Sequence, residues 1–391
     1  MPPLCIRLPD RAGNITEYPL RAQPVAAPPS LPPHRFNRAA LAAAHVVADP
    51  LSANEIDRPA IDWEATLAFR RHLLDCGLMI AEAMDTAQRG MGLPWPAARE
   101  LIRRSLDAVT AQQRPRIFCG VGTDHLAPGE ARGLDSIARA YHMQLREVQA
   151  AGGRVIVMAS RELARIAANA DAYQSVYRRV LAEADRPVIV HWLGGMFDPA
   201  LARYWGSGDL DAAADTLLQI IADNRVKVDG VKVSLLDAGR EIAMRRRLPD
   251  GVKMYTGDDF NYPELIKGDA RGHSHALLGI FDPIAPIAGA ALEALGAGRT
   301  ARYDELMAPT ADLARVIFRS PTCHYKTGVV FLAWLNGFQR HFIMLGGAQA
   351  LRPLPYFTEV FLSADRAGAL LDPPLACARM RRLLAVYGID A

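Results

Sequence analysis

Lys232 is the residue whose type and surroundings point most directly to chemistry. It stands in the run Val228–Val233, near the carboxyl end of an apolar segment. A lysine that points into an apolar interior is costly to keep charged, so its pKa should fall. A neutral amine can attack a carbonyl group and form a Schiff base. The lysine could instead face outward, or pair with Asp258 or Asp259 in a structural ion pair.

Further polar side chains follow other apolar runs. His191 lies near the end of the run before that of Lys232, and histidine can move protons near neutral pH. A core histidine bonded to a backbone carbonyl is the alternative. Asp124 and Arg161 could contact a substrate, or could belong to a surface loop and to a helix start. The candidates for binding substrate hydroxyl or carboxylate groups are Asp85, Asp124, Arg161, Asp258 and Asp259.

His273 and His275 suggest a different class of site. Alternating residues of a strand project to one face, so both could point inward and form a metal site with His191, Asp258 and Asp259. However, they come before or early in the last strand, which places them at the floor of a barrel rather than at its mouth. The leading interpretation therefore includes no metal and no other cofactor.

The elements that must position these residues are short apolar runs alternating with longer amphipathic stretches. The runs predict strands, and strands that are apolar throughout and separated by helices indicate a parallel sheet covered on both faces. The predicted strands are Ala44–Ala48, Leu78–Ala83, Arg116–Val121, Arg154–Met158, Pro187–Trp192, Val228–Val233, Val252–Tyr255 and Ala276–Ile280. The helical patterns between them include Trp63–Cys76, Pro96–Gln112, Leu134–Ala150, Ala172–Ala184 and Leu210–Asn224.

Eight strands predict an α/β fold, a (β/α)8 TIM barrel, which gathers reactive groups at the carboxyl ends of its strands. A doubly wound open sheet is the alternative, but the turn Asp49–Ser52 lacks the glycine-rich pattern expected there.

Two attachments flank the predicted barrel. Nine prolines in the first 40 residues predict an extended arm, with a short hairpin around Ala12–Asn14. Beyond Phe281 the pattern is helical to the end of the chain, with helices expected over Ala288–Leu295, Tyr303–Phe318, Lys326–Leu345 and Leu375–Val386. The expected organisation is an N-terminal proline-rich arm over residues 1–40, a barrel over 41–300 and a C-terminal helical extension over 301–391.

Composition bounds the class of protein. The 391 residues are 50% hydrophobic, which suffices for a sizeable core. Because 45 basic residues nearly balance 42 acidic ones, the net charge is too small to favour binding to nucleic acid or to a membrane surface. The five cysteines form no Cys-x-x-Cys pair, there is no run of about 18 apolar residues, and the N-terminus has no signal-peptide pattern. These features predict a cytoplasmic protein.

These motifs together resemble the dihydrodipicolinate synthase/N-acetylneuraminate lyase superfamily, and within it a branch of unknown function. The resemblance rests on Val228–Val233 and on Tyr255–Asp259, about 20 residues further on, and the order of features agrees over roughly Leu41 to Phe361. It implies a lysine-dependent class I aldolase on a (β/α)8 barrel with a C-terminal helical extension. Lys232 falls on the family's Schiff-base lysine, and Asp258–Asp259 fall on its Gly-Asp-Asp motif.

The resemblance also assigns a role to Thr86 and marks three departures. Thr86 falls on a loop whose threonines hold the carboxylate of a 2-oxo acid and relay a proton. His191 stands where the family has its proton-shuttling tyrosine, Ala87 replaces a second threonine, and Met196 replaces an arginine. The last two replacements leave fewer hydrogen-bond donors for a substrate carboxylate. Arg161 is a candidate to replace the missing arginine.

The leading hypothesis is a lyase of the class I aldolase type that acts on a small polar keto acid or keto sugar. Lys232 would form the imine, while His191 and Thr86 would move protons. A metal-dependent barrel isomerase or aldolase and a non-catalytic sugar-acid binding protein are the alternatives. The resemblance further implies a homo-oligomer, either a dimer or a tetramer, with a small-molecule keto substrate as the partner.

Overall fold

The computed structural model describes residues 4–10, 12–20, 24, 36–52 and 58–389. The chain divides into two compact units. One comprises residues 38–44 and 79–278 and contains the sheet that carries the candidate residues. The other comprises residues 1–37, 45–78 and 279–391, and each unit is described separately below.

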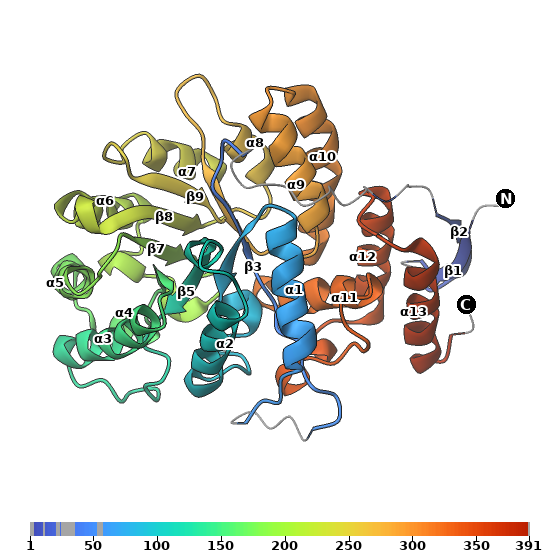
Figure 1. Ribbon diagram of the computed structural model, residues 1–391, viewed down its shortest axis with the longest axis horizontal. Helices are drawn as coiled ribbons and strands as arrows, with labels where there is room; N and C mark the ends of the chain where they lie inside the picture. The colour runs from blue at the N-terminus through green and yellow to red at the C-terminus, as the bar shows by residue number, and fades with distance from the viewer. Residues whose placement is uncertain (1–3, 11, 21–23, 25–35, 53–57, 390–391) are drawn as a thin grey trace. The chain divides into compact units, whose positions relative to one another are not determined.

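The first unit contains a closed barrel of eight parallel strands in the order β10-β3-β4-β5-β6-β7-β8-β9 (Figure 1). Each strand is followed along the chain by at least one helix, so the prediction of a (β/α)8 barrel is confirmed. The strands are β3 (Ala40–Ala43), β4 (Met79–Glu82), β5 (Ile117–Val121), β6 (Arg154–Val157), β7 (Val188–Leu193), β8 (Val228–Ser234), β9 (Lys253–Thr256) and β10 (His275–Leu278). Seven lie within two residues of the predicted runs, whereas β3 begins four residues before its prediction.

The barrel interior is filled by alternate residues of the strands. A strand projects successive side chains to opposite faces, so Ile189 and His191 of β7 face the same way, as do Gly230, Lys232 and Ser234 of β8. The interior side chains that pack together are Leu41, Ala43, Ala81, Met84, Phe118, Ile156, Ile189, Tyr255 and Leu277. Because Ile189 belongs to this core, His191 also faces the interior, one step nearer the carboxyl ends of the strands.

Helices α2 (Trp95–Asp107), α3 (Leu134–Ala150), α4 (Arg161–Ile166), α5 (Ala170–Ala182), α6 (Leu210–Asp223), α7 (Ala238–Arg245) and α8 (Tyr262–Lys267) belong to the same unit. Figure 1 shows α3, α5 and α6 on the outer side of strands β5 to β8. Several begin at side-chain caps: Ser160 accepts the N–H of Leu163, and Asp209 accepts that of Ala212. These caps fix where the loops after the strands end.

The second unit begins with a hairpin and continues with helices. Strand β1 (Cys5–Pro9) pairs antiparallel with β2 (Ile15–Pro19), which confirms the expected hairpin in the arm. Most of the remaining proline-rich arm lies outside the described residues. The helices are α1 (Trp63–Asp75), α9 (Ala285–Gly296), α10 (Thr300–Ile317), α11 (Tyr325–Leu335), α12 (Leu354–Arg366) and α13 (Pro373–Val386). Across the described residues, every helix is too short or too polar to cross a membrane.

Candidate functional site

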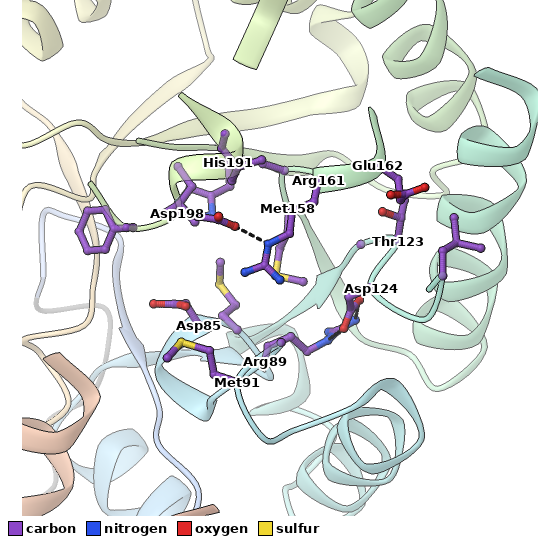
Figure 2. Close-up of a pocket in the computed structure, with 18 of the residues that line it drawn as sticks. Asp85, Arg89, Met91, Thr123, Asp124, Met158, Arg161, Glu162, His191 and Asp198 are labelled. Carbon is purple, nitrogen blue, oxygen red and sulfur yellow. Dashed lines mark hydrogen bonds and ion pairs between the residues drawn. The ribbon is translucent and has the colours of Figure 1, made fainter. Parts of the chain in front are cut away.

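A cavity of about 330 Å³ opens at the carboxyl ends of β4 to β7, the end of a barrel where enzymes of this architecture place their sites (Figure 2). Four segments line it, one after each strand: Met84 to Met91, Gly122 to Pro128, Met158 to Glu162, and His191 to Leu201. Among the predicted site residues, Asp85, Asp124, Arg161 and His191 line this cavity directly.

Lys232 does not line the cavity itself. It lies beside His191, which does, and is only 9% exposed. In the parallel ladder its neighbours are His191 of β7 and Tyr255 of β9. Burial lowers the pKa of the amine to about 8, against the opposing charges of Asp259 and Asp85. Lys232 is therefore a buried amine that is partly neutral near physiological pH.

His191 lies beside this amine and is itself buried. Its Nε2 atom is 3.2 Å from the Oγ atom of Ser234. Burial and the charge of Lys232 hold the pKa of His191 well below its usual value, so the imidazole is neutral at pH 7. A neutral imidazole can accept a proton but has no charge to neutralise a substrate carboxylate.

Asp85 and Thr86 occupy a short 3-10 turn, η2 (Asp85–Ala87), directly after β4. Ala83, which leads into the turn, has a φ of +53°, a conformation that costs an L-residue roughly 1–2 kcal/mol. Asp85 lines the cavity and its charge acts on Lys232, whereas Thr86 is buried and does not line the cavity. The turn therefore presents Asp85, and not Thr86, to the cavity.

Asp124 is engaged by Arg89, a residue that the sequence did not single out. The Nε and Nη2 atoms of Arg89 donate to the two carboxylate oxygens of Asp124, both at 2.6 Å. The remaining guanidinium donors reach the carbonyls of Ala83 and Gly120 and the Oε1 atom of Gln144. Burial raises the pKa of Asp124, but the Arg89 charge and hydrogen bonds outweigh it and the pKa is lowered. Asp124 thus serves to tie loops together at the cavity mouth.

Arg161 is the first residue of α4 and reaches across the cavity. Its Nε donates to the Oδ2 atom of Asp198 at 2.6 Å, which Figure 2 shows as a dashed line. A Cβ atom on Gly90 would lie 3.4 Å from the Arg161 Nη1 atom, so the guanidinium spans from the loop after β6 to the loop after β4. The residue before it, Ser160, is fixed by Thr123, whose Oγ1 lies 2.6 Å from the Ser160 Oγ.

The two aspartates after β9 have different surroundings. Asp258 is buried, and its carboxylate accepts the N–H groups of Phe260 and Asn261 and the side-chain amide of Asn261. It therefore closes the turn that leads into α8, and it does not line the cavity. Asp259 is also buried, and its charge raises the pKa of Lys232. Of the pair, Asp259 is the one that acts on the lysine.

The residues of the alternative metal site are not gathered at one place. His275 is the first residue of β10, at the amino end of the barrel, and its Nδ1 accepts the N–H of Ala39. His191 and Asp258, by contrast, lie toward the carboxyl ends of β7 and β9. Within the described residues, no group of three or more His, Cys, Asp or Glu side chains could hold a metal ion.

Gly257 leaves the space that the Lys232 side chain occupies, which allows the position of that side chain to be tested. A Cβ atom there would lie 2.8 Å from the Lys232 Cε and 2.2 Å from the Ser234 Oγ. We therefore expect Gly257→Ala to displace Lys232 and Ser234 and to lower the free energy of unfolding by about 1–3 kcal/mol. Urea denaturation measures this change.

Gly239→Ala is the matched control, because a Cβ on Gly239 meets only the Asp237 Oδ1 at 3.5 Å. It should not lower the free energy of unfolding. A Gly257→Ala protein as stable as the unaltered protein would contradict this position of Lys232.

Solved structures place the chain in a known class of barrels. Dihydrodipicolinate synthase from Thermotoga maritima is 14% identical and matches with a TM-score of 0.64, over 86% of this chain and 100% of that chain. The enzyme from Oceanobacillus iheyensis is 14% identical, with a TM-score of 0.61 over 91% and 98%. The chloride-inhibited enzyme from Acinetobacter baumannii, complexed with pyruvate, is 16% identical, with a TM-score of 0.61 over 85% and 99%. The fold is thus that of the dihydrodipicolinate synthase type of (β/α)8 barrel.

Within this class, the chain belongs to the family described as "Protein of unknown function (DUF993)", whose model matches residues 6–389. This confirms the resemblance to an uncharacterised branch. No curated protein matches the chain.

Proposed function

We propose that this protein is a lyase of the class I aldolase type in which Lys232 forms a Schiff base with a keto acid. The observation that carries the proposal is the buried amine of Lys232, with a pKa of about 8, beside the neutral His191 and the charges of Asp85 and Asp259. At pH 7 such an amine is neutral about 300 times more often than a lysine of ordinary pKa. The likeness to an enzyme solved with pyruvate supports a keto acid as the carbonyl compound.

The chemistry begins at the carbonyl carbon of the substrate. The neutral amine adds to this carbon, water leaves with the carbonyl oxygen, and a protonated imine remains. Asp85 and Asp259 would stabilise its positive charge, since their charges act on the lysine.

Bond cleavage then requires a base. In a 4-hydroxy-2-oxo acid, removal of the hydroxyl proton by His191 drives the electrons of the C3–C4 bond into the imine. An aldehyde leaves, and the enamine takes a proton at C3 and is hydrolysed to release the shorter keto acid. His191 is available for this step because its imidazole is neutral at pH 7 and lies beside Lys232.

The substrate carboxylate is assigned to Arg161. The guanidinium lies in the cavity and uses only its Nε for Asp198 among the described residues. This arginine would supply the charge that is absent at Met196, which the sequence places where the superfamily has an arginine. In this proposal Thr86, which is buried beside Asp85, positions the turn.

Borohydride reduction in the presence of a panel of keto acids and keto sugars tests the mechanism. We expect a stable adduct on Lys232, located by peptide mass spectrometry, with at least one keto acid. If none of the compounds gives an adduct although one or more of them binds, the protein is a binding protein rather than an aldolase.

The pH dependence of trapping follows from the lowered pKa of Lys232. Only the neutral amine attacks the carbonyl, so the rate should rise about tenfold per pH unit up to about pH 8 and then level off. Initial rates of adduct formation at limiting carbonyl concentration, between pH 6 and 10, measure this curve. A rate that continues to rise to pH 10 would indicate a lysine with an ordinary pKa.

A further inference from the structure

Apart from Asp85 and His191, which the proposed function places at the reacting carbonyl, the polar side chains of the cavity are largely occupied by one another. Arg89 uses its guanidinium on Asp124 and on neighbouring oxygens, and Thr123 shares a hydrogen bond with Ser160. These groups line or border the cavity but have their partners inside the protein. A polyol would have to break such bonds to satisfy its hydroxyl groups, which costs on the order of 1–3 kcal/mol for each group left unpaired.

Glu162, the acidic residue of the wall segment after β6, also has its hydrogen-bond partners within the protein. Its two carboxylate oxygens accept the N–H groups of Gly129 and Ala131, at 2.9 Å and 3.0 Å. The side chain of Arg165 donates to both oxygens as well. Glu162 therefore fastens the loop after β5 and presents no open carboxylate to a sugar.

Apolar side chains make up most of the remaining wall. Three are methionines, Met84, Met91 and Met158, which come from the loop after β4 and from the end of β6. Figure 2 shows Met91 and Met158 near Asp85 and Arg161. Thioether side chains are polarisable and adapt to flat aromatic or branched aliphatic groups. The wall is completed by Leu126, Pro128, Ala159, Leu193, Phe197 and Leu201.

Against this wall, Arg161 supplies the cationic donors that remain open. Its side chain is 57% exposed, and among the described residues only its Nε donates a hydrogen bond, to Asp198. A volume of about 330 Å³ lies at the small end of the range of ligand cavities, and suits a small body with one anionic group.

From this lining we infer that the cavity accepts a keto acid whose body is apolar, an aromatic or branched aliphatic group, rather than a sugar acid or keto sugar. The inference rests on the proposed function for the reacting carbonyl and narrows its substrate class. The carboxylate would lie at Arg161 and the apolar body against the methionines. The polar substrate expected from the sequence is therefore not the one that this lining favours.

The experiment compares keto acids of similar length that differ in hydroxylation. Affinities for 4-phenyl-2-oxobutanoate and for a 3-deoxy-2-keto sugar acid are measured by calorimetry on the Lys232→Met protein, in which binding is separated from imine formation. Adduct formation with the same compounds is measured on the unaltered protein. We expect the phenyl compound to bind at least tenfold more tightly.

Two variants report on the wall. Met91→Gln keeps the length of the side chain but adds an amide, and should reduce the preference for the phenyl compound about tenfold. Met143→Gln, on α3 and outside the cavity lining, makes the same replacement and should leave the preference unchanged.

The outcomes separate this inference from the proposed function. Equal or tighter binding of the sugar acid overturns the inference, whether or not an adduct forms on Lys232. Tight binding of the phenyl compound with no adduct supports the apolar cavity and refutes the Schiff-base mechanism. A preference that survives Met91→Gln undiminished also contradicts the inference, because the methionine wall would then not be its source.

Discussion

Replacement of Lys232 by methionine should abolish borohydride trapping and lower lyase activity by at least about 10³-fold, because no other group at this position can form an imine. Methionine occupies a similar volume and carries no charge, so the barrel should keep its packing. Peptide mass spectrometry and steady-state kinetics on the purified variant measure the two losses.

The Lys232→Met variant should lose activity but gain stability. The pKa of Lys232 is lower in the folded protein than in the unfolded chain, so protonation opposes folding at every pH below about 8. The methionine variant lacks this penalty and should be more stable below pH 8, by up to about 3 kcal/mol. The gain should shrink as the pH rises from about 8 toward 10.5, where unfolded lysine also loses its proton. Urea denaturation at pH 6.5 and at pH 9.5 compares the two regimes.

Lys227→Met is the control for this prediction. Its amine lies just before β8 and donates to the carbonyl of Ala184, away from the cavity lining. Trapping should be retained in that variant. A Lys232→Met protein that still forms an adduct at the wild-type rate would place the reactive amine elsewhere.

Arg89→Met should destabilise the protein by about 3 kcal/mol, the largest effect we expect from a single substitution outside the lysine. The Arg89 side chain is 3% exposed, and its loss leaves the Asp124 carboxylate and the Ala83 and Gly120 carbonyls without their donor. Asp124 is 24% exposed, so water recovers part of its solvation, and the expected loss is below that of a fully buried pair. Chemical denaturation measures the change in the free energy of unfolding.

Two further variants show whether geometry or charge is responsible. Arg89→Lys keeps the charge but cannot reach two carboxylate oxygens and the carbonyls at once, so it should recover less than half of the loss. Arg146→Met removes an exposed partner of Glu183 and should leave stability unchanged. If Arg89→Met is as stable as the unaltered protein, the network around Arg89 does not hold the loops at the mouth.

The barrel could be predicted because its strands are short apolar runs bounded by helices, a pattern that is local in the sequence. The first strand differs from its prediction because residues 40–48 are buried without interruption, and an apolar run alone does not mark that pairing ends at Ala43. In the second unit, the helix expected over Lys326–Leu345 ends at Leu335. Gly337 has a φ of +87°, and Phe342 beyond it folds back to stack on Trp334, which preserves the aromatic spacing without a helix.

The lysine and its neighbours were predictable for a geometric reason. In parallel strands, residues near the carboxyl ends meet at one level, which brings Lys232 beside His191. The role of Arg89 was not predictable, because its partners are backbone carbonyls and side chains that come together only in the folded barrel. The engagement of Asp258 in its own turn is typical of aspartate, whose carboxylate accepts the backbone N–H two residues further on.

The pairing of polar groups around the cavity has a consequence for how the specificity of this protein can change. Because Arg89 and Asp124 satisfy each other, and Glu162 is satisfied by its own loop, the charged framework of the mouth does not depend on a ligand. The three methionines are not part of this charged framework, so replacing one of them breaks none of its ion pairs. Met84 belongs to the barrel core and Met158 packs against it, whereas Met91 is half-buried and outside that core. Substitutions at Met91 can therefore alter the shape of the cavity at small cost to stability, which makes this position an accessible route by which relatives could diverge in substrate range.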